Sequence, residues 1–167
     1  MSTQPSTPDD FYRAYAIAML TWQRVESALF RVYFEMFENG NYSQAGVAYY
    51  SLDSFGAKLR LVDATAGALF DDVELKSWGA LSKEIRAASG DRNVLAHLPA
   101  AVVINDDQSL SLVLGPHIHI PPSLVRKRKT TYDAATCQQL ANHFESLHKR
   151  LDAFRSKRFW TNVGRKD

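Results

Sequence analysis

The 167 residues are enough for one domain that buries a hydrophobic core without disulfides or a structural metal. A hydrophobic fraction of 46% with only eight Gly and six Pro excludes a largely disordered chain, and a single cysteine excludes an internal disulfide. The net charge is +2, but residues 1–116 carry 9 Lys and Arg against 14 Asp and Glu, whereas residues 117–167 carry 11 against 4, so the basic C-terminal third favours an anionic partner such as RNA or an acidic surface of the same protein.

Neither a secretory leader nor a membrane span is expected. The first ten residues are polar, and no stretch approaches the 18 apolar residues that a membrane-spanning helix needs. We expect a cytoplasmic protein without a membrane partner. We also expect a single domain over residues 1–167, with flexible ends at 1–9 and 160–167.

A long first helix is predicted from Pro8 to about Gly40, with Asp9 and Asp10 in its first turn. Apolar residues recur along it every three or four positions, which predicts one buried face. That face consists of Tyr12, Tyr15, Met19, Trp22, Val25, Glu26, Leu29, Val32, Tyr33 and Phe37.

Three further helices are predicted before residue 100. The second is capped by Asn41 or Ser43 and continues to Leu52, and the third covers residues 55–70. The fourth begins after the acidic pair at 71–72 and is stopped by Pro99. The buried residues expected on the third and fourth helices are Leu59, Val62, Ala66, Leu69, Val73, Leu75, Trp78, Leu81, Ile85 and Ala88.

The pattern then changes to short β-strands. Residues 101–104 are apolar, residues 110–114 are apolar except for Ser111, and the two segments flank a polar turn, which predicts a small β-hairpin near 101–114. A last helix is predicted from Thr131 or Asp133 to about Phe159. The predicted fold class is therefore all-α, an up-down bundle of four to five helices with a hairpin insertion.

The end of the fourth helix carries the candidate catalytic residues Arg92, Asn93 and His97. Cleavage of RNA without a metal needs a group that moves protons and a cation that stabilises charge on the phosphoryl oxygens. An imidazole and a guanidinium suit these two roles, and the amide of Asn93 suits orienting His97 or holding a phosphate oxygen. Because one motif supplies only one of each group, two motifs brought together by a symmetric homodimer would form a better site.

This arrangement resembles the HEPN superfamily (higher eukaryotes and prokaryotes nucleotide-binding domains). Its signature is an Arg, most often followed by Asn, and then a His a few residues later, which Arg92, Asn93 and His97 match. A Trp-x-x-hydrophobic-Glu segment in the long first helix, here from Trp22 to Glu26, is also similar. The resemblance covers about residues 10–98 and 131–159. It differs where Leu98 and Pro99 stand in place of a frequent Gly, and where the hairpin is inserted.

The resemblance implies an all-α bundle, usually a homodimer, with the motif at the dimer cleft. In many members it implies metal-independent endoribonuclease activity, which leaves a 2′,3′-cyclic phosphate and requires neither a cofactor nor a metal ligand. Many such nucleases act as toxins or phage-defence effectors, so an antitoxin or another regulatory protein is a further expected partner.

A purely structural role for these residues is the alternative. Arg92 has Asp91, Glu84 and Glu26 as candidate partners for an ion pair, and His97 suits the negative end of a helix dipole. Glu26 falls on the apolar stripe of the first helix, so it is expected to be a partly buried carboxylate that needs a cation. An Arg92–Glu26 pair would satisfy that need.

Other polar residues have weaker claims to a role. His117 and His119 lie on one side of an extended segment without a third ligand of matching spacing, so no metal site is predicted. His143 and His148 are expected to be solvated, and Cys137 to be a half-buried helix residue. A basic run is either a solvated loop or a contact to the RNA backbone, and it consists of Arg126, Lys127, Arg128 and Lys129.

Two classes of function therefore stay open. One is a dimeric endoribonuclease that uses the 2′-hydroxyl as the internal nucleophile. The other is a non-catalytic nucleotide-binding, RNA-binding or dimerisation module, which would bind without turnover. The sequence specifies neither the RNA target nor whether catalysis occurs.

Overall fold

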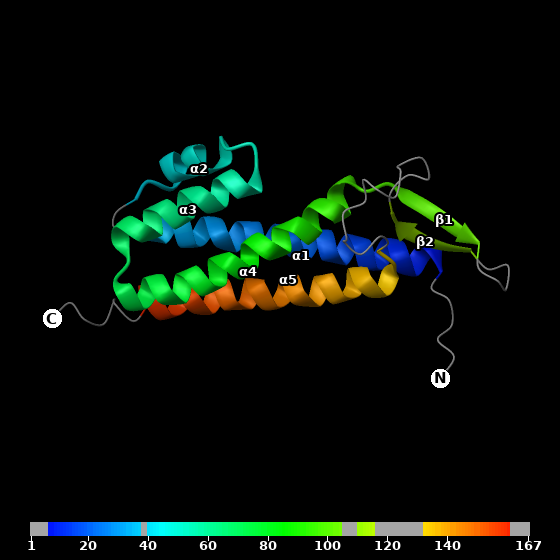
Figure 1. Cartoon of the computed structure of the whole chain (residues 1–167). Helices are drawn as coiled ribbons and strands as arrows, with labels where there is room; N and C mark the ends of the chain where they lie inside the picture. The colour runs from blue at the N-terminus through cyan, green and yellow to red at the C-terminus, as the bar shows by residue number, and fades with distance from the viewer. Residues whose placement is uncertain (1–6, 38–39, 105–109, 116–131, 161–167) are drawn as a thin grey trace, which may run out of the picture.

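The computed structural model describes residues 7–37, 40–104, 110–115 and 132–160, with side chains as far as Arg158. This part of the chain folds into a helical bundle with a two-stranded antiparallel sheet, which confirms the predicted fold class (Figure 1). Its elements are α1 (Pro8–Glu35), α2 (Tyr42–Tyr50), α3 (Phe55–Leu69), α4 (Asp72–His97), β1 (Ala100–Ile104), β2 (Leu110–Leu114), α5 (Ala134–Arg155) and the short π-helix η2 (Ser156–Trp160).

The bundle is elongated, with α1, α4 and α5 along its length (Figure 1). The shorter α2 and α3 lie toward one end, and the hairpin lies at the other end, beside the start of α1. None of the helices in the described ranges combines the length and apolar composition needed to cross a lipid bilayer.

The bounds of α1 follow from its capping residues. Thr7 accepts a hydrogen bond from the backbone N–H of Asp10, and the Asp10 carboxylate accepts one from the backbone of Thr7, so a capping box fixes the start. The helix begins inside the segment 1–9 that was predicted to be flexible. It ends at Glu35, earlier than predicted, because the next turn tightens. At Gly40 an added Cβ would lie 3.0 Å from the Cβ of Phe37, so a larger residue in this turn would have to displace that side chain slightly.

The buried face of α1 differs from the predicted stripe in its first half. Phe11, Ala14 and Ala18 are buried there, whereas the side chain of Tyr12 is 57% exposed. From Trp22 to Tyr33 the prediction holds, because Trp22, Val25, Leu29, Val32 and Tyr33 are all buried. Alanines on the buried face let a neighbouring element approach closely, while a tyrosine hydroxyl is readily solvated at the edge.

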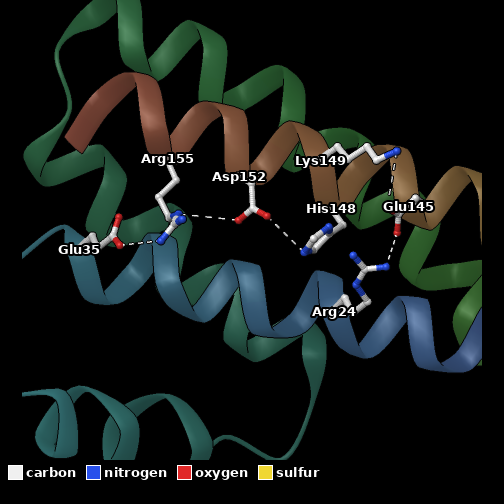
Figure 2. Close-up of polar contacts among 7 residues, drawn as sticks. All are labelled: Arg24, Glu35, Glu145, His148, Lys149, Asp152 and Arg155. Atoms are coloured by element: carbon white, nitrogen blue, oxygen red, sulfur yellow. Dashed lines mark hydrogen bonds and ion pairs between the residues drawn. The ribbon is translucent and has the colours of Figure 1, made fainter. Parts of the chain in front are cut away.

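Helices α1 and α5 form the most extensively packed pair and run parallel to one another. Arg24 Nη1 donates to Glu145 Oε2 at 2.7 Å, and Arg155 Nη1 donates to Glu35 Oε1 at 2.9 Å (Figure 2). These pairs are separated by 121 and 120 residues, and this almost constant offset is the register of two parallel helices.

Helices α3 and α4 form an antiparallel hairpin held by Asp63. Its carboxylate accepts hydrogen bonds from Trp78 Nε1 at 3.0 Å, Ser82 Oγ at 2.6 Å and Arg86 Nη2 at 2.6 Å. The face of α3 that packs in the core contains Leu59, as predicted. Four residues that the pattern placed near the core are instead exposed, and they are Tyr12, Phe37, Leu69 and Val73.

The hairpin is attached to the bundle through β2. Strand β1 pairs with β2 in an antiparallel register from Ala100 opposite Leu114 to Ile104 opposite Leu110. Leu112 and Leu114 are buried against the body of the molecule, whereas every residue of β1 is exposed. Leu114 also exchanges backbone hydrogen bonds with Tyr132, which ties the hairpin to the start of α5.

Two residues of α5, His148 and Cys137, are more buried than the sequence predicts. His143 is exposed, as predicted, but His148 is only 9% exposed and its Nε2 lies 3.3 Å from Asp152 Oδ2. His148 is buried because its face of α5 packs toward α1 (Figure 2). Cys137 is fully buried rather than half-buried, and burial raises the pKa of its thiol to about 11.

Candidate functional site

The predicted motif lies on the last two turns of α4. The helix continues without interruption through Arg92 and Asn93 to His97, its final residue. Leu98 then adopts an extended conformation, and Pro99 leads directly into β1. Arg92 is half-buried, whereas Asn93 and His97 are exposed, so the hairpin leaves the imidazole accessible.

Arg92 and His97, the two ends of the motif, project in different directions from α4. Five residues of α-helix separate Arg92 from His97, which corresponds to about 7.5 Å along the axis and about 140° around it. Asn93 and His97 share one face because they are four residues apart. Asn93 also lies beside the guanidinium, since Arg92 Nη1 donates to Asn93 Oδ1 at 3.3 Å. The amide therefore connects the arginine to the histidine face.

Of the three carboxylates considered for Arg92, the structure pairs it with Glu26. Arg92 Nη2 lies 3.8 Å from Glu26 Oε1, and the two side chains are 29% and 22% exposed. Asp91 instead accepts a hydrogen bond from Tyr132 at 3.3 Å, and Glu84 forms an ion pair with Arg150. The separation of 3.8 Å is longer than a hydrogen bond, so the guanidinium is attracted to Glu26 without being bound to it directly.

Glu26 is held in place by Trp22, four residues earlier on α1. The indole Nε1 donates to Glu26 Oε1 at 2.7 Å. The Trp22 ring is fully buried and makes edge contacts with Phe55 of α3, at 4.7 Å between centroids, and Phe144 of α5, at 5.0 Å. The core of the bundle therefore fixes the indole, and the indole fixes the carboxylate that faces Arg92.

A second cation, which was not predicted from the sequence, lies at this carboxylate. Lys58 Nζ, from α3, lies 3.7 Å from Glu26 Oε2, and the lysine side chain is only 16% exposed. Its ammonium also lies over the rings of Tyr49 and Tyr50, at 5.5 and 5.4 Å from their centroids. No spacing in the sequence links Lys58 to Glu26, because the contact depends on how α3 docks on α1.

The two tyrosines of α2 complete the surroundings of Lys58. Tyr49 is fully buried and its hydroxyl donates to the backbone oxygen of Glu26 at 3.3 Å, which ties α2 to α1. Burial and the nearby Glu26 carboxylate raise the pKa of Tyr49 far above its usual value, and burial also raises that of Tyr50. Both rings are therefore neutral under ordinary conditions and can interact with a cation through their faces.

Some predicted candidates cannot be placed. The basic run from Arg126 to Lys129 and the pair His117 and His119 lie outside the described residues. Within the described ranges, no group of three or more His, Cys, Asp or Glu is arranged to hold a metal ion. The placed candidates are Arg92, Asn93, His97 and Glu26.

No protein-family model, curated protein or solved structure matches the chain. The geometry at the end of α4 is therefore the basis for any functional conclusion.

Proposed function

We propose that this protein is a metal-independent endoribonuclease of the HEPN type. The observation that carries the proposal is the environment of the motif: Arg92 is half-buried with its guanidinium only loosely paired, and Asn93 and His97 are exposed on the same helix end. A purely structural arginine would be expected to hydrogen-bond its carboxylate directly, as Arg155 does to Glu35 at 2.9 Å. This one keeps donors available for a phosphate group.

In the proposed reaction, the 2′-hydroxyl oxygen of RNA bonds to the adjacent phosphorus as the bond from phosphorus to the 5′ oxygen breaks. The products are a 2′,3′-cyclic phosphate and a free 5′-hydroxyl. His97 moves the proton that leaves the 2′-hydroxyl or the proton that the 5′ oxygen gains. Arg92 stabilises negative charge on the phosphoryl oxygens, and Asn93 holds a phosphate oxygen or orients the imidazole.

A second copy of the chain is part of this proposal. Because Arg92 and His97 project about 140° apart around α4, one helix does not direct both side chains at the same phosphorus. Two helices related by a two-fold axis would supply an arginine and a histidine from each side. We therefore propose a homodimer whose axis passes near the end of α4.

The test is cleavage of a mixed pool of structured and single-stranded RNA in EDTA by wild type, Arg92→Ala and His97→Ala. We expect cleavage with cyclic-phosphate ends by wild type alone. Activity should fall at least about 100-fold in either variant, since each removes a group that acts in the transition state. His143→Ala is the matched control, because His143 is also exposed on a helix but belongs to α5 and not to the motif.

Retained cleavage in both motif variants would overturn the assignment. Binding of RNA by wild type without cleavage would instead favour the alternative, a non-catalytic binding or dimerisation module. Thermal melting of each variant shows whether any loss of activity reflects unfolding.

A role as a toxin or phage-defence effector in the cytoplasm is the cellular context that this activity would suit. It predicts that the wild-type gene slows growth when overexpressed and that His97→Ala does not. Co-purification of an acidic protein partner would support control by an antitoxin, and a harmless wild-type gene would argue against the toxin role.

A further inference from the structure

The charges around Glu26 do not balance. Arg92 and Lys58 come from different helices and approach different oxygens of one carboxylate, at 3.8 and 3.7 Å. The short contact to that carboxylate comes from the neutral indole of Trp22, at 2.7 Å. Two cations therefore share one anion, and a single positive charge is left over in the cluster.

Burial makes this excess charge important. The side chains of Lys58, Glu26 and Arg92 are 16%, 22% and 29% exposed, so water screens them less than it screens surface charges. The Nε atom of Arg92 is buried and has no hydrogen-bond acceptor among the described residues, but Nε of Arg155, which pairs with Glu35, has none either. The donors that a ligand would meet are therefore Lys58 Nζ and Arg92 Nη2. An anion placed beside the two cations would balance the charge and could accept the free hydrogen-bond donors.

We propose that Lys58 and Arg92 together form a phosphate-binding position, with Lys58 as its second cation. The ligand is a phosphate group of the RNA backbone, and this identification rests on the proposed nuclease function. Glu26, held by Trp22, keeps the two cations near one another without occupying either one fully. Tyr50, which is 59% exposed beside Lys58, forms the outer edge of the position.

A second lysine shows what an ordinary ion pair at the same distance looks like. Lys149 Nζ also lies 3.7 Å from a carboxylate oxygen, that of Glu145, but its side chain is 73% exposed and Glu145 is held by Arg24 at 2.7 Å. The two lysines therefore match in pairing distance and differ in burial. Lys149→Met is the control for Lys58→Met.

The first experiment uses inorganic phosphate alone. The melting temperature of wild type, Lys58→Met and Lys149→Met is measured against phosphate concentration, with sodium chloride added to keep the ionic strength constant. Wild type and Lys149→Met should gain about 3–6 °C at ten times the dissociation constant. Lys58→Met should lose most of this gain. Any general effect of phosphate on stability is common to all three proteins.

Equal gains in wild type and Lys58→Met, or no gain in wild type, would overturn the phosphate position. Lys58→Arg keeps the charge and should keep most of the gain, which separates loss of the cation from loss of packing. Should Lys58→Met fail to fold, wild type alone gives the answer by NMR: phosphate must shift the Nε–H signal of Arg92, and an unchanged signal contradicts the proposal.

A second experiment separates this proposal from the nuclease function. The affinity for a short RNA in EDTA should depend on salt, and the slope should fall by about one unit in Lys58→Met, since one phosphate contact is lost. Phosphate binding that depends on Lys58, in a protein that never cuts RNA, would leave the anion position standing and remove the nuclease. Cleavage by wild type with no effect of Lys58→Met on binding would support the nuclease function and overturn the phosphate position.

Discussion

Two carboxylates of α1 have nearly the same exposure and nevertheless take part in different arrangements. Glu35, 24% exposed, receives a hydrogen bond from Arg155 at 2.9 Å, and Arg155 also lies 3.7 Å from Asp152 (Figure 2). Glu26, 22% exposed, has two cations at 3.7 and 3.8 Å and no hydrogen bond from either. Burial alone therefore does not distinguish a structural ion pair from cations that are available to a ligand; the closeness of the pairing does.

The largest loss of stability is expected from a substitution in the cluster at Glu35, which consists of Glu35, Arg155 and Asp152. Arg155→Met should lower the free energy of unfolding by about 2–3 kcal/mol, because it leaves the partly buried Glu35 carboxylate without its cation and removes one of the two partners of Asp152. Urea unfolding measures the change. In Arg24→Met the loss should stay below about 1 kcal/mol, since the Arg24 side chain is 54% exposed. Equal losses in the two variants would mean that burial of the Glu35 cluster has no energetic effect.

Cys137 can report on the same loss of stability from the other end of α5, near whose start it is buried. With its pKa raised to about 11, the native thiol should react very slowly with a disulfide reagent at pH 8, so labelling measures opening of the fold. A loss of about 2 kcal/mol in Arg155→Met should speed labelling about 30-fold. Rapid labelling of folded wild type would show that the thiol is accessible without opening.

The cluster at Glu26, which consists of Glu26, Lys58 and Arg92, should contribute less to the free energy of unfolding. Glu26→Gln keeps an oxygen that can accept the Trp22 hydrogen bond and breaks no hydrogen bond to a cation, so the expected loss is about 1 kcal/mol, smaller than at Glu35. Urea unfolding of Glu26→Gln and Glu35→Gln, measured side by side, makes the comparison direct. A loss at Glu26 as large as that at Glu35 would identify the Glu26 cluster as a structural ion pair and weaken the case for a phosphate position.

The smallest effect is expected at an exposed pair, which provides a baseline. Hydrogen bonding from Arg150 lowers the pKa of Glu84 below its usual 4.5. A depressed carboxylate pKa stabilises the fold above pH 4.5, and this contribution is lost as the pH falls through the folded-state value. Wild type should therefore melt slightly above Glu84→Gln at pH 7, and the difference should shrink by pH 3. A difference that grows in acid would contradict the sign of this shift.

The sequence predicted the fold well where hydrophobic periodicity decides it. The third helix is typical: Leu59, Val62 and Ala66 recur at helical spacing, and all three are fully buried. The same reasoning failed in the first half of α1, where tyrosines are as apolar in the pattern as the alanines that are actually buried. Periodicity predicts that a helix has an apolar face, but packing against neighbouring elements determines which of two adjacent faces is buried.

The candidate site was predictable only in part. The fourth helix could be extended to His97 from its pattern, and Glu26 could be recognised as a carboxylate that needs a cation. Lys58 could not be found, because it reaches Glu26 through the docking of α3. His148 was misplaced for a related reason: it precedes Lys149 and Arg150, which are exposed, although its own side chain faces α1 (Figure 2).

The parallel pairing of α1 with α5 also has a consequence for how the protein is made. Glu35 and Arg155 are separated by 120 residues, so α1 is synthesised long before α5, the helix it packs against most extensively. At about 5–20 residues per second, the ribosome needs roughly 6–24 s to supply that partner. During this time the buried face of α1 is without α5, and every fragment that stops short of residue 134 lacks α5 entirely.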